Sequence, residues 1–276
     1  MDSRTGKRIR LGRILRPDTG RGVVVATSHG VLTGPPGGQR TRAEIARTFA
    51  ALAEADAVMV APGMIRLVED TFVGRSAPGL VVEMDWKSWN RPIYPTLTDG
   101  RGEGVVASLA RVEDLAAAGV DGIMTYLYVG QLDQSLEREE IARNALLARE
   151  CSRWGIALII EPRSAREGLD SDATSPRVLS FYSRVSAEIG ADVVKCVWPG
   201  TTEGLAEITE TCFVPVLLAG GPGGEDVDSA VELADSAVRA GAAGVMFGRK
   251  IYRSADPADT LRRINAVVHG ASGEAR

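Results

Sequence analysis

A lysine at the end of a strand-like apolar run is the residue of this sequence whose type and position most clearly suggest a chemical role. Residues 191–194 have the length and composition of a buried parallel strand, and Lys195 ends it. Burying an unpaired ammonium costs several kcal/mol, so desolvation favours the neutral amine, a nucleophile that can form a Schiff base with a ketone or aldehyde. A surface lysine where a strand meets a loop is the alternative interpretation.

The choice of basic residues favours a chemical role for Lys195. The chain has 32 basic side chains, and only Lys7, Lys87, Lys195 and Lys250 are lysines. Arginine stays protonated and cannot act as an amine nucleophile, so lysines retained in an arginine-rich sequence are expected to have a chemical reason. Lys7 lies in a basic N-terminal stretch, whereas the other three each follow an apolar run.

Other polar side chains stand at the ends of further strand-like runs. Glu161 follows the run IALII; enclosure would raise the pKa of this carboxyl toward neutrality and suit a proton shuttle, and an ion pair with Arg163 is the alternative. His29 follows the first run, and we expect it to orient a substrate rather than pack in the core. We expect Tyr126 and Tyr128 to point to opposite faces of their strand, so that at most one lines a site.

Two glycine-rich loops indicate a phosphate site. LAGGPGG contains Gly220 and Gly221, and FGRKIY places Gly248, Arg249 and Lys250 at the start of a short helix. Unobstructed backbone N–H groups and two cations would bind a phosphate there, and loops after the last two strands of a barrel are common phosphate sites. The alternative is that the glycines only form tight turns.

The elements that must position these residues are eight strand-like runs that alternate with helix-like segments. The strand-like runs are residues 23–27, 57–61, 80–84, 122–127, 156–160, 191–195, 214–219 and 243–248. The helix-like segments are residues 42–54, 105–118, 135–154, 175–189, 205–211, 226–240 and 257–268. Continuously apolar runs in this alternation predict an α/β fold, a single (β/α)8 TIM barrel with its active site where the strands end. A doubly wound open sheet competes, but no GxGxxG motif follows the first run.

The ends of the chain fall outside the predicted barrel of residues 23–270. Residues 1–22 are expected to form a capping segment, with Ile9, Leu11, Ile14 and Leu15 on one face of a helix that closes the bottom of the barrel. Seven basic side chains in this segment leave a nucleic-acid arm as the alternative. Residues 271–276 are expected to be a disordered tail.

A long loop follows the third run. It begins with Asp85, Trp86 and Lys87 and continues to residue 104, rich in proline, glycine and tryptophan. We expect these residues to form a lid over the site, and a structural excursion or oligomer contact is the alternative.

Composition excludes several classes of function. A net charge of −4 argues against nucleic-acid or membrane partners. No apolar run approaches the ~18 residues of a membrane span, and the start of the chain does not resemble a signal peptide, which indicates a cytoplasmic protein. Three scattered cysteines and two histidines predict neither disulfides nor a metal site, and we expect no cofactor.

These motifs together resemble a known family. RIRLGRIL, SHGVLTGP, YVG, EPR, GADVVK, PVLLAGGP and AGAAGVMFGRKIYRSADP occur in order over nearly the whole chain. They are similar to the class I, Schiff-base aldolases of the archaeal-type fructose-bisphosphate aldolase branch, which includes aminodideoxyheptulosonate synthases and the autoinducer-2 phosphate thiolase. The resemblance implies a deoxyribose-phosphate-aldolase-like barrel that acts on phosphorylated small molecules as a homo-oligomer.

The resemblance also implies roles for single residues. Lys195 matches the Schiff-base lysine, Gly220, Gly221, Gly248 and Arg249 match the phosphate-binding loops, and His29 matches the histidine of an Asp-His-Gly motif. Three positions depart from the family pattern. Ser28 stands where the family usually has an aspartate, Glu161 where it usually has a tyrosine, and Lys250 where it usually has an asparagine.

The resulting hypothesis is a lyase or transferase that forms an imine between Lys195 and a phosphorylated keto compound. Glu161 would move protons, His29 would orient oxygens, and Ser28, Tyr128 and Arg163 would contact substrate. Because the proton-transfer residues depart from the family pattern, specialised biosynthesis is favoured over glycolysis. The alternatives are thiolase-like acyl transfer on a phosphorylated dione and a non-catalytic barrel that binds sugar phosphates.

Overall fold

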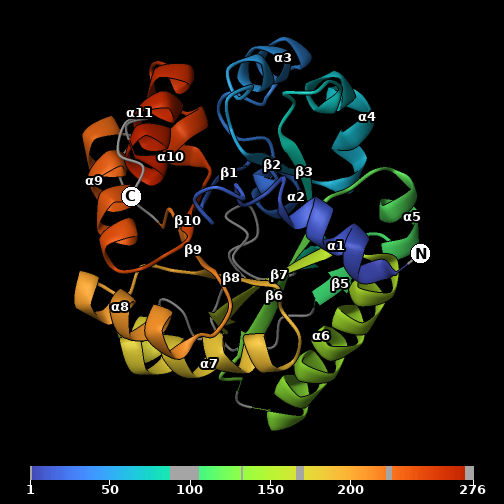
Figure 1. The fold of residues 1–276 in the computed structure, drawn as a ribbon. Helices are drawn as coiled ribbons and strands as arrows, with labels where there is room; N and C mark the ends of the chain where they lie inside the picture. The colour runs from blue at the N-terminus through green and yellow to red at the C-terminus, as the bar shows by residue number, and fades with distance from the viewer. Residues whose placement is uncertain (1, 88–105, 132, 166–170, 222–225, 271–276) are drawn as a thin grey trace.

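The computed structural model describes residues 2–87, 106–131, 133–165, 171–221 and 226–270, and it contains a closed parallel β-barrel (Figure 1). Its strands lie in the order β1-β10-β9-β8-β7-β6-β3-β2. Each overlaps one of the eight predicted runs, so the predicted TIM barrel is confirmed. The strands are β1 (Gly22–Ala26), β2 (Ala57–Val60), β3 (Gly79–Glu83), β6 (Gly122–Val129), β7 (Ala157–Ser164), β8 (Val193–Cys196), β9 (Val216–Ala219) and β10 (Gly244–Phe247).

A ring of helices surrounds the barrel. Figure 1 looks along the barrel and shows the strands at the centre with the helices outside them. The main helices are α3 (Arg42–Ala50), α5 (Val112–Ala117), α6 (Gln134–Trp154), α7 (Pro176–Glu188), α8 (Thr202–Thr211), α9 (Val227–Arg239) and α11 (Pro257–His269). Shorter ones are α2 (His29–Thr33), α4 (Ile65–Val68), α10 (Arg249–Tyr252) and the 3-10 turns η1 (Pro62–Met64), η2 (Glu69–Phe72) and η4 (Ser171–Thr174).

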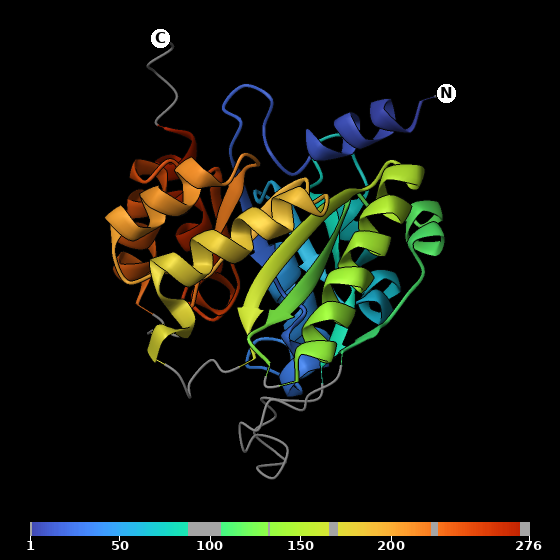
Figure 2. The same cartoon turned by 90° about the horizontal axis from the view of Figure 1, so that it is seen from below.

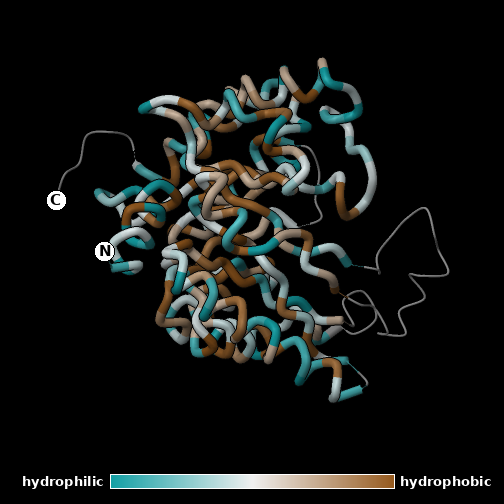
Figure 3. Tube along the Cα trace, turned by 90° about the vertical axis from the view of Figure 1, so that its right-hand side faces the viewer, coloured by the Kyte–Doolittle hydropathy of each residue, from teal (hydrophilic) through white to brown (hydrophobic). Residues whose placement is uncertain are grey.

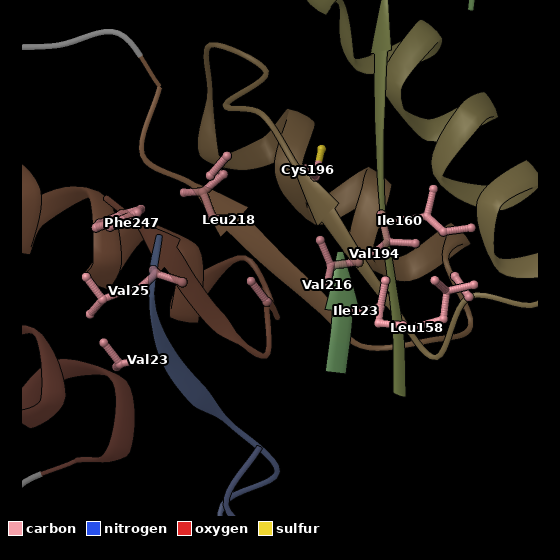
Figure 4. Close-up of a cluster of buried hydrophobic side chains, with 14 of the residues drawn as sticks. Val23, Val25, Ile123, Leu158, Ile160, Val194, Cys196, Val216, Leu218 and Phe247 are labelled. Atoms are coloured by element: carbon pink, nitrogen blue, oxygen red, sulfur yellow. The ribbon is translucent and has the colours of Figure 1, made fainter. Parts of the chain in front are cut away.

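The strands alternate between two apolar environments, which explains why their sequences are continuously apolar. One set of side chains packs between the strands and the helices, as Figure 4 shows for Val23, Val25, Leu158, Ile160 and Val194. The intervening side chains fill the inside of the barrel. The hydropathy colouring of Figure 3 accordingly places apolar stretches through the middle of the molecule and polar ones toward its periphery.

The N-terminal segment lies at the end of the barrel where the strands begin. Helix α1 (Ser3–Leu11) crosses this end in Figure 2. The expectation that Ile9 to Leu15 share one face of a helix is wrong, because α1 ends at Leu11 and Ile9 is 64% exposed. The turn that follows α1 enters the barrel instead, and its Ile14 is fully buried. Gly22 and Gly122 leave room for Ile14, because a Cβ at either position would clash with it.

The region after β3 differs from prediction. Asp85–Lys87 forms a strand, β4, that pairs antiparallel with β5 (Val106–Ser108), so the predicted helix over 105–118 exists only as α5. Residues 88–105 of the expected lid lie outside the described residues. Asp85 is no lid residue, because it is fully buried and its carboxylate accepts hydrogen bonds from Thr125 Oγ1 (2.7 Å) and Arg143 (3.0 Å).

Candidate active site

Three charged side chains enter the barrel from the ends of its strands. Glu83 on β3, Glu161 on β7 and Lys195 on β8 each stand two positions after an apolar side chain of the barrel interior, namely Val81, Ile159 and Val193. Because residues two apart in a strand share a face, these side chains extend the interior stack toward the carboxyl ends. Charged groups are therefore layered directly on an apolar interior.

The closest polar contact in this layer joins Lys195 to Glu161. Lys195 Nζ lies 2.6 Å from Glu161 Oε2, and Arg163 Nη1 donates to Glu161 Oε1 at 3.0 Å. Glu161 is only 1% exposed and Lys195 only 8%. The lysine is thus paired with a carboxylate rather than isolated in an apolar pocket, and Glu161 is the base within reach of its proton.

The electrostatics of Glu161 contradict the expected raised pKa. Burial by itself would raise the pKa of this carboxyl, but the opposing charges of Lys195 and Arg163 and their hydrogen bonds outweigh burial and lower it. Of the two interpretations weighed from the sequence, the ion pair is observed, and the proton shuttle stays a prediction. Glu161 forms the ion pair with Arg163 and also contacts the candidate nucleophile.

A cavity of about 660 Å³ opens over Lys195 and Glu161. The described residues that line it include six cationic side chains and a single carboxylate, Glu161; the cations are Lys87, Arg163, Lys195, Arg249, Lys250 and Arg253. Gly220, Gly221 and Gly248 complete the wall formed by the last two strand ends. In a chain with a net charge of −4, such a concentration of positive charge indicates that the cavity receives an anion.

Gly248 allows His29 to lie against the start of α10. A Cβ at Gly248 would come within 2.6 Å of His29 Cε1 and would also clash with the Ala26 carbonyl. His29 lines the cavity, and its Nδ1 lies 3.1 Å from the Tyr252 hydroxyl. Burial, reinforced by the charges of Arg249 and Lys195, lowers the pKa of His29 to about 4, so the imidazole is neutral at pH 7.

The lowered pKa of His29 predicts acid sensitivity of the fold. Between pH 6.5 and 4 the unfolded chain protonates this histidine while the folded protein does not, so acidification favours unfolding. We expect up to about 3 kcal/mol of the unfolding free energy to be lost over this window, and His29→Gln to remove that part of the loss. Denaturant titrations at several pH values measure it. Equal pH dependence in wild type and His29→Gln would contradict the assignment.

The expectation that Tyr126 and Tyr128 of β6 point to opposite faces of the strand is wrong. They point to the same face of the strand, because positions two apart always do, and their ring centroids lie 5.3 Å apart inside the barrel. Tyr126, rather than the expected Tyr128, lines the cavity. Lys87 Nζ lies over both rings, 5.2 Å and 5.6 Å from their centroids. These cation–π contacts hold a second lysine side chain beside the cavity.

Two further positions complete the charged layer. Ser28 does not line the cavity; its hydroxyl is buried and donates to Glu83 Oε2 at 3.3 Å. Glu83 was not predicted as a site residue, although it ends an apolar run just as Glu161 does. Trp86 lies half-buried on β4, between Asp85 and Lys87. Within the described ranges, no group of three or more His, Cys, Asp or Glu side chains is arranged to hold a metal, and no helix could cross a membrane.

Comparison with known proteins decides the family. A model described as "DeoC/LacD family aldolase" matches residues 23–254. The chain belongs to the DeoC/LacD aldolase family. The resemblance drawn from the sequence motifs is confirmed, and the protein is an enzyme of the aldolase type.

The relatives of this DeoC/LacD aldolase include a synthase. It is 30% identical over 264 residues to an uncharacterised aldolase of Saccharolobus solfataricus, covering 96% of this chain and 94% of that protein. It is 28% identical over 272 residues to the 2-amino-4,5-dihydroxy-6-oxo-7-(phosphonooxy)heptanoate synthase of Streptomyces griseus, covering 97% and 93%. An archaeal fructose-1,6-bisphosphate aldolase, solved with its catalytic lysine bound to a carbinolamine intermediate, matches with a TM-score of 0.78 at 21% identity, covering 96% of this chain and all of that one.

Proposed function

We propose that this DeoC/LacD aldolase forms a Schiff base between Lys195 and a phosphorylated ketone, such as a ketose phosphate or dihydroxyacetone phosphate. It would then make or break a C–C bond through the enamine, in a specialised biosynthetic reaction. The observation that carries the proposal is the Lys195–Glu161 contact of 2.6 Å inside a cavity lined by cations. The name of the Streptomyces griseus relative, a synthase of a phosphorylated keto compound, supports the substrate class.

Each side chain has a role in this reaction. Glu161 accepts a proton from Lys195, which frees the amine to attack the ketone carbon and give a carbinolamine. Neutral His29, held by Tyr252, hydrogen-bonds a substrate oxygen. Arg163 and Tyr126 border the part of the cavity next to Glu161.

The phosphate would lie between the last two strand ends. Arg249 and Lys250 follow β10 after Gly248, and Gly220 and Gly221 follow β9 without side chains that obstruct their N–H groups. Lys250 is buried and Arg249 exposed, so one cation lies in the wall and the other at the mouth. This arrangement supports charge-assisted hydrogen bonds to a dianion.

The function is tested by incubating the protein with borohydride and a panel of phosphorylated and unphosphorylated ketones, followed by mass spectrometry. We expect covalent labelling with phosphorylated ketones. Turnover of a phosphorylated dione that depends on coenzyme A would instead indicate the thiolase-like alternative. Binding of sugar phosphates without any labelling or turnover would indicate the non-catalytic barrel. A homo-oligomer and a cytoplasmic location remain predictions.

We expect Arg249→Ala to weaken the binding of dihydroxyacetone phosphate by about 1.5–3 kcal/mol, the range for a hydrogen bond to a charged group. Affinity for unphosphorylated dihydroxyacetone should not change, because the lost contact is to the phosphate. Isothermal titration calorimetry measures both. Arg239→Ala, which removes an exposed arginine paired with Asp235 on α9, is the matched control. Equal weakening for both ligands would count against a phosphate site at Arg249.

A further inference from the structure

Lys87 is a cation of the cavity to which the proposed reaction so far gives no role. It lies on β4, is 8% exposed, and lines the same cavity as Lys195. Its Nζ lies 5.2 Å from the ring centroid of Tyr126 and 5.6 Å from that of Tyr128. These two contacts hold the ammonium at one place in the wall, where low exposure to water strengthens its action on any charge that forms nearby.

Asp85 fixes the strand that carries Lys87. Its carboxylate is fully buried, and one oxygen accepts a hydrogen bond from Tyr126 N at 2.7 Å. The other oxygen accepts from Arg143 Nη1 at 3.0 Å. In the register of β6 and β7, Tyr126 pairs with Glu161. Asp85 therefore ties β4, and Lys87 with it, to the residue of β6 that lies beside Glu161.

The strand order places this wall opposite the proposed phosphate loops. In the closed ring β1-β10-β9-β8-β7-β6-β3-β2, β6 lies four strands from β10, and β3, which precedes β4, lies four strands from β9 (Figure 1). Four strands are half of the ring. Lys195 on β8 and Glu161 on β7 lie on the arc between the two walls. The nucleophile therefore has the phosphate loops on one side and Lys87 with Tyr126 on the other.

The chemistry of the ketone gives this arrangement a direction. In dihydroxyacetone phosphate the ketone carbon lies between the phosphate-bearing carbon and the hydroxymethyl carbon, and the hydroxymethyl carbon becomes the nucleophile when the imine turns into an enamine. With the phosphate at the loops after β9 and β10 and the imine on Lys195, the hydroxymethyl carbon would extend toward Lys87 and Tyr126. The aldehyde would then lie against this wall.

We propose that Lys87 is a catalytic residue that binds the aldehyde oxygen, and that Asp85 is its positioning residue. This inference rests on the proposed function. As the enamine nitrogen donates its electron pair, the hydroxymethyl carbon bonds to the aldehyde carbon, and the C=O double bond becomes a C–O single bond with negative charge on oxygen. The Lys87 ammonium stabilises this oxygen and gives it a proton. Through water, Lys87 regains the proton that left the hydroxymethyl carbon when the enamine formed. Cleavage runs the same transfers backwards.

Lys87→Met separates the aldehyde step from the ketone steps. The ketone steps are followed at saturating dihydroxyacetone phosphate by borohydride labelling and by deuterium exchange at the hydroxymethyl carbon, measured by NMR in heavy water. The aldehyde step is followed as condensation with a neutral, a phosphorylated and a carboxylated probe, namely glycolaldehyde, glyceraldehyde 3-phosphate and succinic semialdehyde. We expect Lys87→Met to label and exchange like the wild type but to condense about 10²–10³-fold more slowly, the range for the loss of one group that stabilises an oxyanion.

The controls are read as the ratio of condensation to exchange. Lys250→Met removes the same group from the phosphate side, so it should lower both rates in parallel and keep the wild-type ratio. Lys87→Arg retains a cation over the rings and should recover part of the condensation rate. Asp85→Asn should lower the ratio. Asp121→Asn should keep it, because Asp121 is a buried carboxyl that accepts from Leu80 N at the opposite end of the barrel.

The outcomes separate this inference from the proposed function. Wild-type protein that is never labelled would overturn the proposed function, and this inference with it. Wild-type protein that labels and exchanges but condenses none of the three aldehydes would overturn this inference alone, and so would a wild-type ratio in Lys87→Met. If Lys87→Met does not fold, seen as the loss of both labelling and exchange, Lys87→Gln takes its place and is judged by the same ratio.

Discussion

Lys195→Met is expected to abolish both borohydride labelling and turnover. In the wild type, the mass of the reduced ketose phosphate should appear on the peptide that holds Lys195, because this amine combines a barrel-interior position with a carboxylate 2.6 Å away. Without the amine the imine cannot form, and only binding and orientation remain. We therefore expect kcat to fall by at least about 10⁴-fold, as for other enzymes that lose a covalent nucleophile.

The other two lysines of the cavity provide matched controls. Lys87 and Lys250 line the same space as Lys195, so Lys87→Met and Lys250→Met remove the same chemical group from a different wall. Each should still be labelled at Lys195, although a weaker affinity for the anionic substrate is expected. Peptide mapping that places the label on Lys87 or Lys250 would show that the nucleophile has been assigned to the wrong lysine.

The second large effect is expected for Glu161→Gln. The amide keeps the size of the carboxylate but cannot accept a proton from Lys195, and it leaves the ammonium without its counter-charge. We expect kcat to fall by about 10²–10⁴-fold, the range for a general acid–base group. Affinity for the phosphate should change little, because Arg249 and Lys250 lie on other strand ends. Steady-state kinetics and calorimetry with a phosphorylated ketone measure the two quantities.

Glu140→Gln controls for the loss of a buried glutamate–arginine pair. Glu140 on α6 binds Arg143 through both carboxylate oxygens, at 2.9 Å and 3.0 Å, outside the cavity. Its substitution should lower the stability of the protein and leave kcat near the wild-type value. If Glu161→Gln keeps most of the wild-type activity, the proton acceptor lies elsewhere, and His29 and Tyr126 are the next candidates on the cavity wall.

The barrel was predictable because its signals are local. Eight apolar runs separated by helical segments determine eight buried strands, and each observed strand falls within or beside its predicted run. The segment after β3 was harder. Residues 105–118 have helical periodicity, yet Val106–Ser108 pairs with β4 instead, because the tertiary contact with Asp85–Lys87 outweighs local preference.

The electrostatics of the site could not be read from the chain. Glu83 and Glu161 both end apolar runs, and nothing local distinguishes them. In the folded barrel β7 lies beside β8, so Glu161 meets Lys195, whereas Glu83 on β3 meets Ser28 and has Asp85 next to it. The expected property, a carboxyl whose pKa is raised by burial, exists in the structure, but on the other glutamate. The predicted barrel already places β7 beside β8, but the hydrogen bonds and ion pairs that each carboxyl forms, which decide its pKa, depend on side-chain packing that a single sequence does not specify.

The turn that carries Ile14 into the barrel has a kinetic consequence. Ile14 fills the barrel at the end where the strands begin, and it packs there with Val24, Val81 and Met124. Substrates therefore reach Lys195 from the opposite end, where the strands end. In a two-substrate condensation the ketone must reach the deepest position and the aldehyde must follow it inward. Binding is then compulsorily ordered: the aldehyde is released first in the cleavage direction, and an excess of aldehyde should inhibit by occupying the entrance before the ketone arrives.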